Sequence, residues 1–184
     1  LIIYNYLKGL KKEVNLVDPT QIITCTNEFG FGQVVMEVSK EKATKYLAHL
    51  KQINICPGFI AKTLDGDFTT LGRGGSDYTA ALFANFYKAS ALEIWSDVSG
   101  LMTADPRLVT AARVIPHLSY EDALELSHFG ARVIYPPTIQ PALEQNIPII
   151  IKNTFKLTDL GTKITSSWED NSTIKGISSI DEIC

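Results

Sequence analysis

The sequence predicts an α/β layered fold. β-branched runs alternate with helical patterns along the 184 residues, and repeated strand-then-helix units are typical of sheets covered by helices. The run 147–151 is a continuous hydrophobic strand of the kind that parallel sheets bury. Hydrophobic residues make up 45% and charged residues 20% of the chain, which indicates an ordinary globular composition.

Each expected element follows from a local signal. Apolar residues at helical spacing indicate helices, β-branched runs indicate strands, and Pro or Gly marks the breaks. In chain order we expect a helix over 1–10, strands over 14–17 and 21–26, a helix over 41–52, a strand over 53–60 interrupted at 57–58, a hairpin over 62–71, a helix over 78–89, a buried strand over 91–95, helices over 119–130 and 136–146, a strand over 147–151, and the start of a strand over 173–178.

Three of these elements rest on specific pairs. Asp65-Gly66 fits a tight hairpin turn between two alternating runs. Ser119 followed three residues later by Asp122 resembles a capping box at a helix start. Pro136-Pro137 suits the first turn of a helix.

Composition narrows the function classes. The net charge of −3 gives no basic footprint for nucleic acid, and no apolar run approaches the ~18 residues of a membrane span. The three cysteines are odd in number and widely spaced, which favours a reducing cytoplasm over a disulfide framework. The three histidines lack ligand spacing, so we expect no metal site built from protein ligands.

The segment Gly72–Asp77 (GRGGSD) is the most informative one. A glycine-rich turn between a strand and a helix lets backbone N–H groups approach an anion, and Ser76 or Asp77 can cap the helix. Arg73 is suited to bidentate binding of a carboxylate or phosphate. An ordinary tight turn with a good cap explains the same residues.

Two further segments carry candidate residues. Asp97 follows a strand, where ligands of open α/β sheets collect, and Asp105-Pro106 presents Arg107. Arg132 follows Gly130 at an expected helix end. Turn capping by the aspartates, a solvated Arg107 and a helix-end cation are the alternative interpretations.

Four segments taken together resemble the later part of aspartate kinases, members of the amino acid kinase superfamily. They are TTLGRGGSDYTAAL (69–82), EIWSDVSGLMTADPR (93–107), LSYEDALELSHFGARVIYP (118–136) and IPIIIKNT (147–154). The tail is similar to the bifunctional aspartokinase–homoserine dehydrogenase type.

The resemblance implies a three-layer α/β/α sandwich of the amino acid kinase type, mainly its nucleotide-binding C-terminal part. Residues 1–172 would be a truncated amino acid kinase domain. Residues 173–184 would start a linker or the first strand of a regulatory module. The glycine-rich strand-loop with a phosphate-binding lysine, which such kinases carry upstream, does not occur before Leu1, so we expect the fragment alone to be inactive.

The implied activity is ATP-dependent phosphorylation of the L-aspartate side chain to 4-phospho-L-aspartate, with Mg²⁺ carried by the nucleotide phosphates. A cytoplasmic location and a homo-oligomer in the intact enzyme are expected, with no nucleic acid or membrane partner. A non-catalytic ligand-binding domain of this fold, or a kinase for glutamate or a nucleoside monophosphate, are the alternatives.

The resemblance also assigns roles to residues. Arg73 and Asp77 would be catalytic. The acceptor-binding set would be Arg73, Ser76, Asp77 and Phe59, and the nucleotide-binding set Ser96, Asp97, Met102, Arg107 and Arg132. Three of these depart from the family's usual residues, which are Thr at position 96, Tyr at 102 and Lys at 132.

Overall fold

The computed structural model describes residues 1–128, 133–167 and 176–177. The chain divides into two compact units, unit 1 (Leu1–Thr79) and unit 2 (Ala80–Cys184), and each is described by itself. Helices and strands occur in both units, so the predicted α/β class is confirmed. Most of the strand expected over 173–178 lies outside the described residues.

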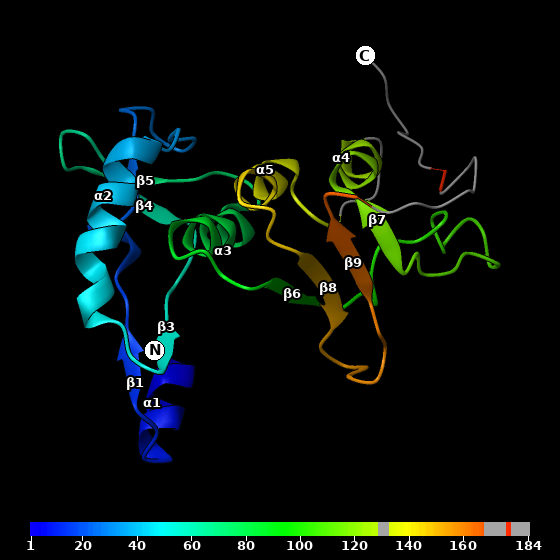
Figure 1. Cartoon of the computed structure of the whole chain (residues 1–184), viewed down its shortest axis with the longest axis horizontal. Helices are drawn as coiled ribbons and strands as arrows, with labels where there is room; N and C mark the ends of the chain where they lie inside the picture. The colour runs from blue at the N-terminus through cyan, green and yellow to red at the C-terminus, as the bar shows by residue number, and fades with distance from the viewer. Residues whose placement is uncertain (129–132, 168–175, 178–184) are drawn as a thin grey trace. The chain divides into compact units, whose positions relative to one another are not determined.

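Unit 1 contains two small sheets (Figure 1). Its elements are α1 (Ile2–Gly9), β1 (Val14–Leu16), the 3₁₀ turn η1 (Pro19–Gln21), β2 (Thr24–Cys25), α2 (Met36–Tyr46), η2 (Leu47–His49), β3 (Ile53–Ile55), β4 (Ile60–Thr63), β5 (Phe68–Thr70) and the start of α3 (Gly75–Phe86). β1 pairs with β3 in parallel, and β2-β4-β5 form the second sheet.

The predicted hairpin of unit 1 is confirmed. β4 and β5 pair antiparallel with Ala61 opposite Thr69, and Gly66 has the positive φ of 93° that the turn requires. The Thr63 hydroxyl accepts a hydrogen bond from the backbone N–H of Asp67 at 3.1 Å and closes the turn. This hairpin ends at the glycine-rich segment, so it fixes where that segment begins.

Among its described residues, unit 2 contains one four-stranded sheet in the order β6-β8-β9-β7 (Figure 1). Its elements are the rest of α3, β6 (Leu92–Ser96), β7 (His117–Ser119), α4 (Tyr120–His128), η3 (Pro136–Thr138), α5 (Ile139–Glu144), β8 (Ile149–Asn153) and β9 (Thr162–Thr165). β6 runs parallel to β8, β8 antiparallel to β9, and β9 parallel to β7. Figure 1 shows α4 and α5 on the same side of this sheet.

The core of unit 2 lies between the sheet and its helices. Side chains of alternate residues in β8 and β9 are fully buried, including Ile149, Ile151 and Ile164. The buried Tyr120 hydroxyl donates a 2.5 Å hydrogen bond to the Ile147 carbonyl, which ties α4 to the segment before β8. The predicted capping box also forms, because Ser119 and Asp122 exchange hydrogen bonds at 2.6–3.1 Å.

Several element boundaries were wrong. α2 begins at Met36, ahead of the expected 41, and α3 begins at Gly75, ahead of 78. The strand over 91–95 is half-buried, because Glu93 and Trp95 are exposed on one face of an edge strand. β7 and β9 were not expected as strands. None of the described helices has the length and hydrophobicity that a membrane span requires.

Candidate active site

The glycine-rich segment forms the predicted turn between a strand and a helix. Gly72 and Gly74 have φ of 73° and 68°, a left-handed conformation that glycine adopts without a Cβ clash. A Cβ at Gly72 would also lie 2.5 Å from the Phe31 ring, so a larger residue here would strain the backbone and displace that ring. The Gly75 N–H donates to the Gly72 carbonyl at 3.0 Å and closes the turn.

The helix start corrects one expectation. α3 begins at Gly75, so Ser76 and Asp77 lie inside its first turn and neither occupies the position before the helix. Asp77 is the acidic residue of this turn, where a carboxylate is favoured by the helix dipole. The two side chains are therefore available to a ligand and are not engaged as the helix cap.

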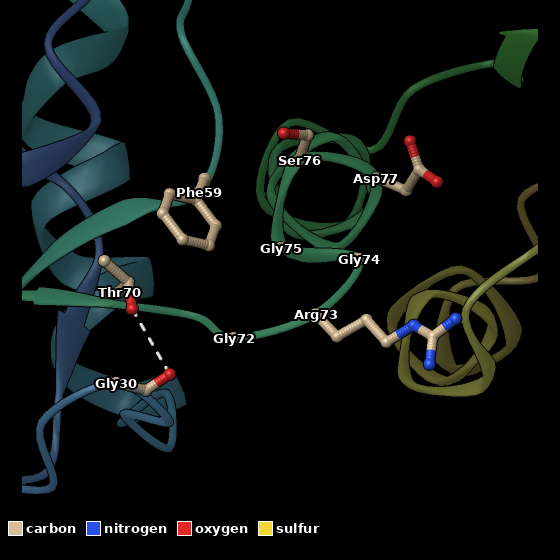
Figure 2. Close-up of a pocket in the computed structure, with 9 residues that line it drawn as sticks. All are labelled: Gly30, Phe59, Thr70, Gly72, Arg73, Gly74, Gly75, Ser76 and Asp77. Carbon is tan, nitrogen blue, oxygen red and sulfur yellow. Dashed lines mark hydrogen bonds between the residues drawn. The ribbon is translucent and has the colours of Figure 1, made fainter.

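A cavity of about 370 Å³ opens at this turn. Figure 2 shows the residues that line it, which are Gly30, Phe59, Thr70, Gly72, Arg73, Gly74, Gly75, Ser76 and Asp77. The four residues expected to bind the acceptor are thus brought together around one cavity. Arg73 and Ser76 are exposed, and the Arg73 guanidinium points away from the Phe59 ring (Figure 2).

Phe59 has an unusual backbone. Its φ is 79°, and a bulky side chain in this region costs on the order of 1–3 kcal/mol. Its carbonyl accepts a hydrogen bond from Leu71 N–H at 2.9 Å, and its N–H donates to the Thr79 hydroxyl at 3.0 Å. A Cβ at the preceding Gly58 would lie 2.7 Å from the Cα of Ser76, so this linker packs directly on α3. Tertiary contacts hold the Phe59 ring, 42% exposed, at the cavity.

Asp77 is electrostatically perturbed. Partial burial raises the pKa of its carboxyl above the usual value, because desolvation disfavours the charged form. A cationic group bound beside it would favour the charged carboxylate and oppose this shift. An arginine and a partly desolvated carboxylate at one small cavity therefore suit a ligand that carries both charges.

One wall of the cavity was not predicted. The loop over 27–33 is held against β5, because Gly32 N–H donates to the Thr70 carbonyl at 3.0 Å and the Thr70 hydroxyl donates to the Gly30 carbonyl at 3.2 Å (Figure 2). The available signal was the alternation of Phe29 and Phe31 with Gly30 and Gly32.

The residues expected to bind nucleotide are in unit 2. Ser96 ends β6, and its hydroxyl accepts a hydrogen bond from Val98 N–H at 3.3 Å. Asp97 is exposed in the loop that follows. Met102 is half-buried and forms a bridge with Val114.

Asn153 organises the loop after β6 and was not singled out from sequence. Its side-chain N–H₂ donates to the Asp97 carbonyl at 3.2 Å and to the Ser99 hydroxyl at 3.0 Å, and its carbonyl oxygen accepts from Phe155 N–H at 2.8 Å. Ser99 in turn donates to Asp159 at 2.5 Å. Asn153 is 5% exposed at the end of β8, so the sheet fixes the loop.

Arg107 lies on the turn that Asp105 caps. The Asp105 carboxylate accepts from the Arg107 backbone N–H at 2.8 Å, as one of the alternative interpretations expected. It also pairs with the guanidinium, so Arg107 is not simply solvated. Arg132 lies outside the described residues.

No group of three or more His, Cys, Asp or Glu could hold a metal ion among residues 1–128, 133–167 and 176–177. Asp77 and Asp97 are in different units and each is a single carboxylate. These two carboxylates do not form a metal cage.

The match to known proteins covers the residues expected to bind the acceptor and those expected to bind nucleotide. Residues 2–153 match the Amino acid kinase family. The chain belongs to this family. It is 41% identical over 171 residues to the bifunctional aspartokinase/homoserine dehydrogenase of Haemophilus influenzae, which covers 92% of the chain and 21% of that protein.

Two solved structures place the fold among aspartate kinases. Escherichia coli aspartokinase III in complex with aspartate and ADP matches with a TM-score of 0.87 and 34% identity, over 92% of this chain and 38% of that one. Aspartate kinase of Clostridium acetobutylicum matches with a TM-score of 0.76 and 33% identity, over 89% of this chain and 36% of that one. The fold is therefore that of the amino acid kinases. The chain spans about a fifth of the length of the bifunctional relatives.

Proposed function

We propose that this chain belongs to an aspartate kinase, which transfers the γ-phosphoryl group of ATP to the side-chain carboxylate of L-aspartate. The observation that carries the proposal is the cavity of about 370 Å³ at the turn 72–77, lined by Arg73, Ser76 and Asp77. Its size falls in the range of small-ligand pockets, roughly 300–1,000 Å³. The relative with the TM-score of 0.87 is a complex with aspartate and ADP.

The charges at the cavity suit an α-amino acid with a second carboxylate. Arg73 would bind a carboxylate of aspartate through paired N–H groups. Asp77 would accept a hydrogen bond from the ammonium group, whose positive charge would offset the effect of desolvation on the pKa of Asp77. Ser76 would donate its hydroxyl to a carboxylate oxygen, and Phe59 would close the apolar side.

The nucleotide would lie on unit 2. Ser96, Asp97 and Met102 would contact it, Arg107 would reach its phosphates, and Arg132 would flank the adenosine or phosphates. Mg²⁺ would accompany the phosphates and supply charge neutralisation to the transfer.

The protein's task is to bring two anions together. Two unit negative charges at about 4 Å repel by about 4 kcal/mol at an effective dielectric of about 20. Positioning and fixed positive charge therefore matter more than covalent help in phosphoryl transfer. We expect no turnover by the 184-residue chain alone, because it covers 38% of the relative that binds both aspartate and ADP.

Calorimetric titration of the chain with L-aspartate, L-glutamate and uridine monophosphate tests the proposal. L-Aspartate should bind best, and Arg73→Ala should weaken it about ten- to a hundredfold, the loss expected for charged hydrogen bonds. Lys45→Ala is the matched control, because Lys45 is an exposed cation paired with Glu41 on α2. Preference for another ligand would favour a different amino acid kinase.

A second experiment separates enzyme from binding domain. The complete reading frame that encodes the chain is assayed for ATP-dependent formation of an acyl phosphate, trapped with hydroxylamine. Binding of aspartate without any trapped product would favour a non-catalytic ligand-binding domain.

A further inference from the structure

Thr79 connects the two elements that form the acceptor cavity. It lies on α3, one turn after Gly75, and is 3% exposed. Its hydroxyl donates to the Gly75 carbonyl at 2.7 Å and accepts from the Phe59 N–H at 3.0 Å. The donor and acceptor capacity of this hydroxyl is thus used on both sides, and Thr79 itself does not line the cavity.

The contact with Phe59 is made where the backbone needs support. Phe59 has a positive φ of 79°, which a bulky residue keeps only when the surroundings determine it. Two hydrogen bonds hold it, one from Leu71 at the end of the hairpin and one to Thr79 on the helix. Without the Thr79 hydroxyl, the Phe59 N–H has no side-chain acceptor. The strained backbone of Phe59 then keeps one of the two hydrogen bonds that hold it.

We propose that Thr79 is a positioning residue of the acceptor site: its buried hydroxyl fixes the Phe59 backbone against the first turn of α3 and so holds the Phe59 ring at the cavity lined by Arg73 and Asp77. The inference rests on the proposed function and deepens it, because it names a determinant of the acceptor side. A fixed ring sets the length of the cavity, so the same hydroxyl should contribute to selectivity for aspartate over the longer glutamate.

The test compares Thr79→Val, which removes the hydroxyl at nearly constant shape, with Thr79→Ser, which keeps it. Ser39→Ala is the matched control. Ser39 is fully buried in the same unit, and its hydroxyl also accepts from a backbone N–H and donates to a carbonyl, both of Thr24. Each variant is titrated with L-aspartate, L-glutamate and ADP, and its midpoint of thermal unfolding is measured.

Thr79→Val should weaken L-aspartate binding about tenfold, the factor that one lost hydrogen bond produces, and narrow the gap to L-glutamate. ADP affinity should stay unchanged, Thr79→Ser should restore aspartate affinity, and Ser39→Ala should lower the unfolding midpoint without changing aspartate affinity. Unchanged aspartate binding in Thr79→Val would overturn the inference. The inference would also be overturned if Thr79→Val lost equal affinity for aspartate and ADP and Ser39→Ala lost as much. Thr79 would then only stabilise the fold.

Hydrogen exchange at the Phe59 amide separates this inference from the proposed function. If the unmodified chain binds no aspartate, the proposed function fails, and the exchange rate still decides the role of Thr79. Faster exchange at Phe59 in Thr79→Val, restored in Thr79→Ser, supports the positioning contact, and an unchanged rate overturns it. Should Thr79→Val not fold, Thr79→Cys takes its place, because a thiol is a weaker hydrogen-bond partner and gives a smaller change in the same direction.

Discussion

The Asp105 carboxylate holds the guanidinium of Arg107 in a fork. The Arg107 Nε lies 3.1 Å from both carboxylate oxygens, and Nη2 lies 2.7 Å from Oδ2. These hydrogen bonds hold the pKa of Asp105 below its usual value. A phosphate that recruits Arg107 would therefore have to compete with Asp105 for the same N–H groups.

The first prediction concerns this pair. Arg107→Ala should lower ADP affinity about tenfold. Hydrogen bonds to charged groups contribute about 1.5–3 kcal/mol, and part of this is already spent because ADP must displace Asp105 from the guanidinium. Asp105→Asn is the control: the amide oxygen can still accept from the backbone, and ADP affinity should stay equal or rise by no more than about fivefold, because exposed pairs are weak. Fluorescence titration with a labelled nucleotide measures both. Weaker ADP binding in Asp105→Asn would contradict the competition.

The second prediction concerns Asp77 and pH. Its pKa is raised in the folded chain, so the folded state binds the proton more tightly than the unfolded state and gains stability as pH falls through that pKa. Asp77→Asn should therefore raise the unfolding midpoint at pH values above that pKa, where the carboxylate is charged, and the advantage should shrink as the pH falls below it. Calorimetric scans between pH 4 and pH 8, within roughly the range where carboxyl groups with raised pKa titrate, measure this.

Binding of L-aspartate should depend on pH through the same carboxyl group. If Asp77 accepts a hydrogen bond from the ammonium group of aspartate, affinity for L-aspartate should decrease as the pH is lowered. The decrease should be steeper in the unmodified chain than in Asp77→Asn. The carboxyl groups of the ligand titrate equally in both proteins, so the difference reports Asp77. Parallel pH profiles would contradict a contact with the ammonium group.

The third prediction concerns the linker before Phe59. Gly58→Ala places a Cβ 2.7 Å from the backbone Cα of Ser76, which cannot move aside cheaply. We expect a loss of about 1–3 kcal/mol in the free energy of unfolding and weaker aspartate binding. Gly9→Ala is the matched control, because a Cβ at Gly9 meets nothing within 4 Å, and its stability should be equal or slightly higher. Chemical denaturation of both variants provides the comparison.

The fourth prediction concerns Asn153. Asn153→Ala removes two hydrogen bonds to the loop after β6 and one from Phe155 N–H. The free energy of unfolding should fall by about 1–3 kcal/mol, because buried partners lose their hydrogen bonds. ADP affinity should fall as the loop loosens, and aspartate affinity should not. Asn15→Ala, at a half-buried asparagine of β1, is the control and should change neither affinity.

The sequence predicted those parts of the fold that local chemistry determines. The hairpin at Asp65-Gly66 and the capping box at Ser119 need only neighbouring residues, and both form. β7 and β9 were missed because each is three or four residues long and mixes polar with apolar side chains. Their pairing depends on segments remote in the chain.

The candidate site also combines features that the sequence shows with features that depend on distant contacts. The turn and its Arg73, Ser76 and Asp77 were visible as a motif, and the structure brings them to one cavity with Phe59. The positive φ of Phe59 and the supporting Thr79 could not be read from sequence, because a contact 20 residues away creates them. The roles of these residues, the domain boundary at 172 and the cytoplasmic location stay predictions.

The mixed sheet of unit 2 has a consequence for folding. β8 and β9 are close in the sequence and pair antiparallel. β6 pairs with β8, which places Leu92 opposite Ile149 although most of the sequence of the unit separates them. Closing a long loop costs conformational entropy before strand pairing can stabilise it. The local β8–β9 hairpin should therefore form first, and β6 and β7 should then add to its two edges. During synthesis the first strand of this sheet would therefore stay unpaired until Thr165, the last residue of the hairpin, has left the ribosome.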